Sequence, residues 1–96
     1  MPWDFPYWQG LRFAAPSLMA GNTIVLKPAI ATMQYGIEIE KMFDKAGVPQ
    51  GVFQTIVGDS SAAEILIDSD GISAVTFTGN VPVGAKVAQR ATSQIK

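Results

Sequence analysis

The residues best suited to bind an anion lie in one stretch, AVTFTGNVPVG at positions 74–84. The β-branched and aromatic residues at 74–78 are typical of a strand. Gly79 permits backbone conformations that other residues avoid, and Pro82 suits the first turn of a helix. Such a strand–helix junction directs free backbone N–H groups and the positive end of the helix dipole at one spot, which favours a phosphate. The alternative is an ordinary loop that binds nothing.

Two familiar nucleotide motifs do not fit. Gly79 and Gly84 have the spacing of the phosphate-binding G-x-x-x-x-G loop, but AKV follows where that motif requires Lys and Ser or Thr, so we exclude a nucleoside triphosphatase. The dinucleotide fingerprint G-x-G-x-x-G is absent from the sequence. Lys27 is a second candidate because it ends an apolar strand, and open α/β sheets bind ligands at that end. Its alternative role is a solvated strand end.

Composition limits the chemistry. The chain has no Cys and no His, so it cannot form a disulfide, a Cys nucleophile, a Ser-His-Asp triad or an ordinary zinc site, and no metal is expected. A net charge of −1 without a basic stripe argues against nucleic-acid binding. No apolar run has membrane-spanning length and the first residues do not resemble a signal peptide, so a cytoplasmic protein is expected.

The balance of apolar and charged residues bears on partners. Hydrophobic residues make up 48% of the chain and charged residues only 16%, below the usual share of about a quarter. So few charges leave little polar material to cover a small domain. We therefore expect surface to be buried against a partner, with a homo-oligomer as the simplest case.

Helical and strand patterns alternate along the chain. We expect an aromatic loop over residues 1–8, where Pro2 and Pro6 disfavour a regular helix or central strand. Helices are expected at 9–20, 32–46, 59–68 and 81–94, and strands at 23–27, 52–57 and 74–78. This order predicts an α/β fold with a partial Rossmann-like parallel sheet of three strands (β-α-β-α-β-α), preceded by the loop and one helix.

Expected helix ends are Gly21 after the first helix and Gly47 after the second. Thr32 is expected to cap the second helix, and Ser61 with Glu64 to form a capping box in the third.

Four segments together resemble the NAD(P)-dependent aldehyde dehydrogenase family. PWDFP at 2–6 is similar to the family's P-W-N-F-P, and GNTIVLKP at 21–28 to its G-N-T-V-V-L-K-P. AGVPQGVF at 46–53 is similar to A-G-L-P-x-G-V-F, and FTGN at 77–80 with Gly84 to F-T-G-S-x-x-x-G. The segments follow the family's order and spacing over nearly the whole chain. Within the family, the sequence looks closest to succinate-semialdehyde and related dehydrogenases.

The resemblance implies that residues 1–96 form a single partial cofactor-binding domain, a middle piece of an enzyme that oxidises an aldehyde to its acid with NAD or NADP. The implied cofactor contacts are Pro2, Trp3, Lys27, Ile30, Gly58, Gly79, Asn80 and Val83. In this family Lys27 would bind the adenosine ribose hydroxyls or a 2′-phosphate. Gly79 and Asn80 would lie at the pyrophosphate and Val83 against the adenine, while Pro2 and Trp3 would contact the cofactor near the catalytic site.

Three departures from the family pattern affect this expectation. The family's catalytic Cys and general-base Glu have no counterpart in the chain, which should be inactive alone. Asp4 stands where the family has the Asn that stabilises the oxyanion; an ionised carboxylate only accepts hydrogen bonds, and losing one such donor costs about 10²–10³ in rate. Ile30 replaces a Glu that accepts the ribose hydroxyls in NAD-preferring members, which favours NADP. The alternative is a non-catalytic remnant that self-associates or docks on a full-length homologue.

Overall fold

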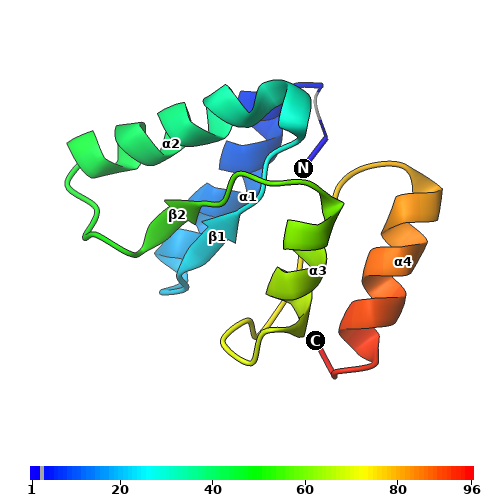
Figure 1. The fold of residues 1–96 in the computed structure, drawn as a ribbon. Helices are drawn as coiled ribbons and strands as arrows, with labels where there is room; N and C mark the ends of the chain where they lie inside the picture. The colour runs from blue at the N-terminus through cyan, green and yellow to red at the C-terminus, as the bar shows by residue number, and fades with distance from the viewer. Residues whose placement is uncertain (3) are drawn as a thin grey trace. The chain divides into compact units, whose positions relative to one another are not determined.

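The computed structural model describes residues 1–2 and 4–96, so the predicted cofactor contact of Trp3 lies outside the described residues. The chain divides into two compact units, residues 1–57 and residues 58–96. Figure 1 shows the elements of both in chain order. Among the described residues, no helix combines the length and apolar character needed to cross a membrane.

The first unit holds a two-stranded parallel sheet and two long helices. Its elements are α1 (Pro6–Met19), β1 (Ile24–Leu26), the 3-10 turn η1 (Ile30–Thr32), α2 (Met33–Lys45) and β2 (Phe53–Thr55). β1 and β2 pair in parallel with Ile24 opposite Phe53, and α2 makes the crossover between them. The predicted α/β class with a parallel, Rossmann-like arrangement is confirmed.

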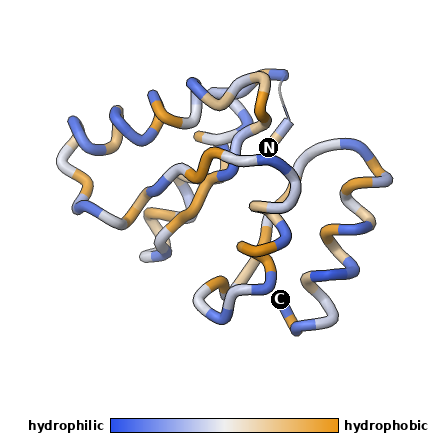
Figure 2. The backbone as a smooth tube through the Cα atoms, in the orientation of Figure 1, coloured by the Kyte–Doolittle hydropathy of each residue, from blue (hydrophilic) through white to orange (hydrophobic). Residues whose placement is uncertain are grey.

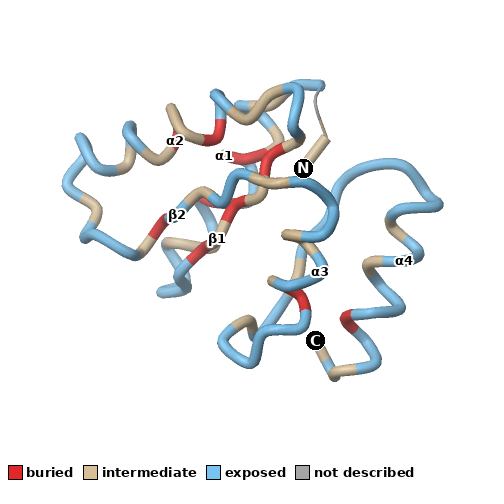
Figure 3. The backbone as a smooth tube through the Cα atoms, in the orientation of Figure 1, coloured by how far each residue is buried: buried red, intermediate tan, exposed pale blue. Residues whose placement is uncertain are grey.

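Both helices of this unit pack on the same face of the sheet. Ala14 of α1 and Ile39 of α2 join Ile24, Leu26 and Phe53 in one buried cluster, and Ile39 is only 1% exposed. Ile24 and Leu26 share a face of the sheet because side chains alternate along a strand. Phe53 lies on that face too, because it pairs with Ile24. Figure 3 shows this buried material along β1, β2 and the facing side of α2.

Glycine ends both helices as the sequence predicts. Gly21 and Gly47 each have φ of +89°, a conformation with little cost only for glycine. After α2, the N–H of Gly47 donates to the oxygen of Asp44, and the N–H of Val48 to that of Phe43, both at 3.1 Å. This is the Schellman pattern, which satisfies carbonyls left free at a helix end.

The start of the chain differs from the prediction of an aromatic loop over residues 1–8. Helix α1 begins at Pro6, earlier than the expected residue 9. Proline at the first helical position is compatible with a helix because the N–H there has no partner within the helix. Thr32 precedes α2 as expected, but its side chain makes no capping hydrogen bond.

The second unit consists of two helices, α3 (Ser60–Asp68) and α4 (Val81–Thr92). Ile67 of α3 and Ala91 of α4 are buried, and Figure 2 shows apolar positions recurring among polar ones along α4. Outside this core, Arg90 donates to Asp68 with both Nε and Nη2, at 2.8 and 2.5 Å. The two helices are therefore joined by apolar packing and by a bidentate ion pair.

Two local predictions for this unit are wrong. The capping box of Ser61 and Glu64 does not form, because Asp59 caps α3 and accepts the Ser61 N–H at 2.9 Å. The third strand at 74–78 is also absent: the sheet has two strands, and residues 72–78 carry no regular structure. A strand needs a neighbour for its backbone groups, and the unit in which this segment lies contributes only helices.

Candidate functional site

In the first unit, the candidate cofactor residues lie at the end of β1 and the start of α2. Lys27 follows directly after β1 and is half-buried. Its Nζ donates to the Pro28 carbonyl oxygen at 3.3 Å. Ile30 opens η1 with its side chain 56% exposed. The structure thus brings Lys27 and Ile30 to one corner of the sheet, where the ammonium carries only a neutral backbone acceptor among the described residues.

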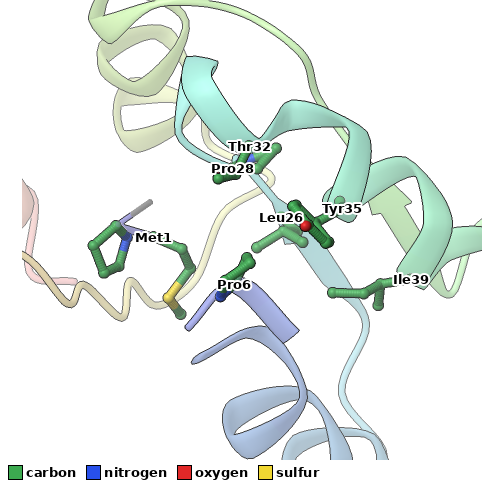
Figure 4. Close-up of a pocket in the computed structure, with 9 residues that line it drawn as sticks. Met1, Pro6, Leu26, Pro28, Thr32, Tyr35 and Ile39 are labelled. Atoms are coloured by element: carbon green, nitrogen blue, oxygen red, sulfur yellow. The ribbon is translucent and has the colours of Figure 1, made fainter. Parts of the chain in front are cut away.

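A small pocket lies beside this corner. It is lined by Met1, Pro2, Pro6, Leu26, Pro28, Thr32, Tyr35, Gly36 and Ile39. Figure 4 shows Leu26 and Tyr35 between the Pro28–Thr32 side and Ile39, with Pro6 below. No charged side chain lines the pocket, so its walls suit an apolar group and not a phosphate. Pro2 lines it, whereas Lys27 and Ile30 do not.

The electrostatics of this corner are positive. The amino group of Met1 donates to the Lys27 carbonyl oxygen at 3.2 Å. Burial, and secondly the charge of Lys27, lower the pKa of that amino group. Asp4 is the acidic residue nearest to Met1 in the sequence, and its side chain is exposed in the turn before α1.

In the second unit, Asn80 occupies the N-cap of α4. Its Oδ1 accepts the Val83 N–H at 2.9 Å, and its backbone oxygen accepts the Gly84 N–H at 2.9 Å. Pro82 has no N–H to offer. Of the first N–H groups of α4, only that of Val81 is left without a partner among the described residues. The expected cluster of free donors is therefore reduced to one N–H and the carboxamide of Asn80.

Gly79 has a different role from the one its sequence pattern suggests. Its φ is not positive, unlike that of Gly21, Gly47 and Gly51. A Cβ at Gly79 would lie 2.5 Å from Cζ of Phe77, and one at Gly84 would lie 3.3 Å from Cε1 of the same ring. The lack of a side chain at Gly79, and to a lesser degree at Gly84, thus allows the Phe77 ring to lie close to the backbone, a contact that the sequence reasoning missed. The aromatic residue two positions before the glycine was the signal that could have found it.

The remaining candidates of this unit are also placed. Gly58 precedes α3, and a Cβ there would lie 2.7 Å from Cβ of Ala62 in the first turn of that helix. Val83 stands exposed in the first turn of α4. The structure therefore brings Gly79, Asn80 and Val83 together at the start of one helix.

Comparison with known proteins gives a family match and many similar sequences, of which two are described here. The model of the "Aldehyde dehydrogenase family" matches residues 1–96. The chain is 50% identical to "Probable succinate-semialdehyde dehydrogenase [NADP(+)]" of Synechocystis sp., over all of this chain and 21% of that protein. It is 44% identical to "Succinate-semialdehyde dehydrogenase [NADP(+)]" of Mycobacterium avium, over all of this chain and 20% of that protein.

A solved structure of lactaldehyde dehydrogenase superposes with a TM-score of 0.91 and 36% sequence identity, covering 98% of this chain and 20% of that one. The chain thus spans about a fifth of the length of the proteins it matches.

Proposed function

Since this chain belongs to the aldehyde dehydrogenase family, we propose that it is part of an enzyme that oxidises an aldehyde to the carboxylic acid. We take residues 1–96 as one partial cofactor-binding domain of that enzyme. In the overall reaction, aldehyde, water and NAD(P)+ give the acid, NAD(P)H and a proton. The observation that carries the proposal is the family match, because it covers the whole chain.

The cofactor contacts form two groups. In the first unit, the Lys27 ammonium would bind the adenosine ribose or its 2′-phosphate, since its present partner is a neutral carbonyl 3.3 Å away. Pro2 lines the apolar pocket beside it and would contact the cofactor near the catalytic site. When bound, NAD(P)+ would supply the hydride acceptor.

In the second unit, Gly79 and Asn80 would bind the pyrophosphate, Val83 the adenine, and Gly58 would be a further contact. Asn80 suits this role although the family pattern has Ser. Its Oδ1 is engaged with the Val83 N–H, so its Nδ2 still has N–H donors to offer to a phosphate oxygen.

We infer a preference for NADP over NAD. Ile30 offers no acceptor to a ribose hydroxyl, and the positive charge of Lys27 favours a 2′-phosphate. The relatives whose names specify NADP(+) support the same preference. Succinate semialdehyde is the proposed substrate of the complete enzyme on the strength of those same names.

Two observations favour the second candidate, a non-catalytic chain that self-associates or docks on a full-length homologue. Asp4 stands where the family pattern has the Asn that stabilises the oxyanion, and its carboxylate would repel developing negative charge. Large apolar side chains are exposed at both ends of α1: Phe5 and Trp8 are 70% and 62% exposed at its start, and Met19 is 88% exposed at its end. Exposed apolar side chains of this size fit burial against a protein partner, and we propose a homo-oligomer. A cytoplasmic location stays a prediction.

A fluorescence titration separates the two candidates. The tryptophan emission of the purified chain is followed as NADP+ or NAD+ is added, for the wild type, Lys27→Met and the control Lys41→Met on exposed α2 surface. The proposal predicts saturable quenching, stronger with NADP+, in the wild type and the control, and its loss in Lys27→Met. Absence of saturable quenching in the wild type supports the non-catalytic candidate. Equal binding by all three proteins contradicts the role of Lys27.

A further inference from the structure

In the described part of the chain the sheet has two outer edges, one on β1 and one on β2. The outer edge of β2 is the side of that strand that does not pair with β1. The Ile24 N–H donates to Val52 oxygen at 2.9 Å, and the Ile56 N–H donates to Leu26 oxygen at 2.8 Å. Because backbone groups alternate in direction along a strand, Val52 and Ile56 face β1, while Phe53 and Thr55 face outward. An outward row of backbone groups is a template for pairing with another strand.

One helical residue reaches this edge. The Thr55 N–H donates to Oε2 of Glu40 at 3.2 Å, from α2. One turn earlier on the same helix, the Gly36 carbonyl oxygen accepts the Thr55 hydroxyl at 2.9 Å. Thr55 is therefore held by two successive turns of α2, through its backbone and through its side chain. Both Glu40 and Thr55 are half-buried, so bulk water does not fully screen the contact.

We propose that the hydrogen bond from the Thr55 N–H to Glu40 closes the outer edge of β2, so that a second copy of this chain cannot add a strand there. A strand that added here would have to place a carbonyl oxygen where the Glu40 carboxylate lies. The Thr55 N–H would then exchange the charged Glu40 carboxylate for a neutral carbonyl oxygen as its acceptor. A hydrogen bond to a charged acceptor is the stronger of the two, so the exchange is unfavourable. The carboxylate would also repel the incoming carbonyl dipoles.

The chain itself supplies the partner that this contact excludes. β2 and the residues after it read FQTIV at 53–57, with the β-branched and aromatic composition that favours strands. Ile56 and Val57 at its end are 38% and 49% exposed. The outer edges of β2 in two copies of the chain can pair about a two-fold axis, which makes the two strands antiparallel. A second copy of β2 therefore fits the edge once Glu40 is removed.

The test compares the self-association of three variants with the wild type. Glu40→Ala removes the acceptor, and Glu40→Gln keeps an oxygen that can still accept the Thr55 N–H. Glu38→Ala is the matched control: it lies on the same helix and loses an exposed contact with Lys41 and Gln34 instead. Sedimentation velocity over a concentration series gives the association of each protein, and infrared spectra report added intermolecular strand.

We expect Glu40→Ala to associate at a concentration about tenfold lower than the wild type, with a gain of strand signal. Glu38→Ala should follow the wild type, and Glu40→Gln, which keeps an acceptor but loses the charge, should fall between the wild type and Glu40→Ala. Association of Glu40→Ala no stronger than that of Glu38→Ala would overturn the proposal, and so would equal association of Glu40→Gln and Glu40→Ala.

Hydrogen exchange in the unmodified chain provides a test that needs no variant to fold. Phe53 and Thr55 lie on the same edge, but only the Thr55 amide has the Glu40 acceptor among the described residues. We expect the Thr55 amide to exchange about tenfold more slowly than that of Phe53, relative to their intrinsic rates. Equal protection of the two amides would mean that Glu40 does not close the edge.

Discussion

The Asn80 Oδ1 accepts the Val83 N–H at 2.9 Å, so the first turn of α4 is capped by the same side chain that we propose to bind the pyrophosphate. Structural and binding roles of Asn80 can therefore be separated by choosing the substitution. Asn80→Ala removes the cap and should lower the free energy of unfolding of the second unit by about 1 kcal/mol. Asn80→Asp keeps the acceptor and adds a negative charge that the helix dipole favours, so its stability should be unchanged or higher.

Cofactor binding should respond to Asn80→Asp in the opposite direction from stability. The carboxylate of Asn80→Asp would repel the pyrophosphate and should weaken NADP+ binding by about tenfold, which is close to the interaction energy of two unit charges about 4 Å apart in water. Chemical denaturation and a cofactor titration on the same two variants check both points. If Asn80→Asp binds NADP+ as well as the wild type does, Asn80 is only a helix cap.

The contact between Phe77 and Gly79 predicts a steric cost. A Cβ at Gly79 would lie 2.5 Å from the ring of Phe77, so Gly79→Ala must displace that exposed ring and should destabilise the second unit by about 0.5–1.5 kcal/mol, the cost of moving a side chain off its rotamer. Gly71→Ala is the control, since the nearest atom to its Cβ is Ser69 Oγ at 3.8 Å.

Combining Gly79→Ala with Phe77→Ala should cost less than the sum of the two single changes, because the clash disappears with the ring. Helix content followed through denaturation gives the four values. Additive costs would mean that the ring and the glycine are not coupled.

The ion pair between α3 and α4 predicts sensitivity to acid. The hydrogen bond from Arg90, followed by that from Gln94, lowers the pKa of Asp68 below its ordinary value of 3.8. A carboxyl whose pKa is depressed by folding stabilises the folded state fully above its ordinary pKa, and that contribution is lost as the pH falls through the depressed value. The second unit should therefore lose stability below about pH 4.

The Asp59 carboxylate acts in the same direction, because hydrogen bonds from the side chain and backbone of Ser61 lower its pKa. Asp68→Asn should remove part of the pH dependence, whereas Asp70→Asn, in the turn after α3, should leave it unchanged. Hydrogen exchange of α3 and α4 amides between pH 3 and pH 6, corrected for intrinsic rates, measures the effect. Identical pH profiles for both variants would contradict the role assigned to the ion pair.

The chain should not catalyse aldehyde oxidation by itself, since its sequence has no cysteine to act as the nucleophile. We expect no NADPH formation above a protein-free control when succinate semialdehyde and NADP+ are added to the purified chain. Turnover that follows the protein through successive purification steps would contradict this expectation.

Local signals in the sequence predicted the first unit well. Gly21 and Gly47 mark real helix ends because positive φ is a local property of the backbone. The apolar runs around Ile24 and Phe53 became paired strands because each lies next to an amphipathic helix that covers it. Pro6 was misread because proline both ends helices and begins them, and only the surrounding chain decides which.

Predictions that depend on distant partners did less well. Residues 74–78 have strand composition, but composition does not supply the neighbouring strand that a sheet requires. Gly79 was identified, but its contact with Phe77 was not: the aromatic residue two positions earlier was a signal for it, although spacing alone does not say that the ring folds back over the glycine. The capping of α4 by Asn80 was likewise visible only once Oδ1 and the Val83 N–H were placed.

The most direct test of the central claim is a map of NADP+ binding by nuclear magnetic resonance on the 15N-labelled chain. We predict saturable shifts at the backbone amides of Lys27, Gly79, Asn80 and Val83, and no shifts at exposed residues of α2 such as Lys41. In the same titration with NAD+, the shift at Lys27 should be smaller and the shifts at Gly79, Asn80 and Val83 should be unchanged, because NAD+ lacks the 2′-phosphate. Shifts confined to other residues, or none at millimolar NADP+, would contradict the assignment of these residues to a cofactor site.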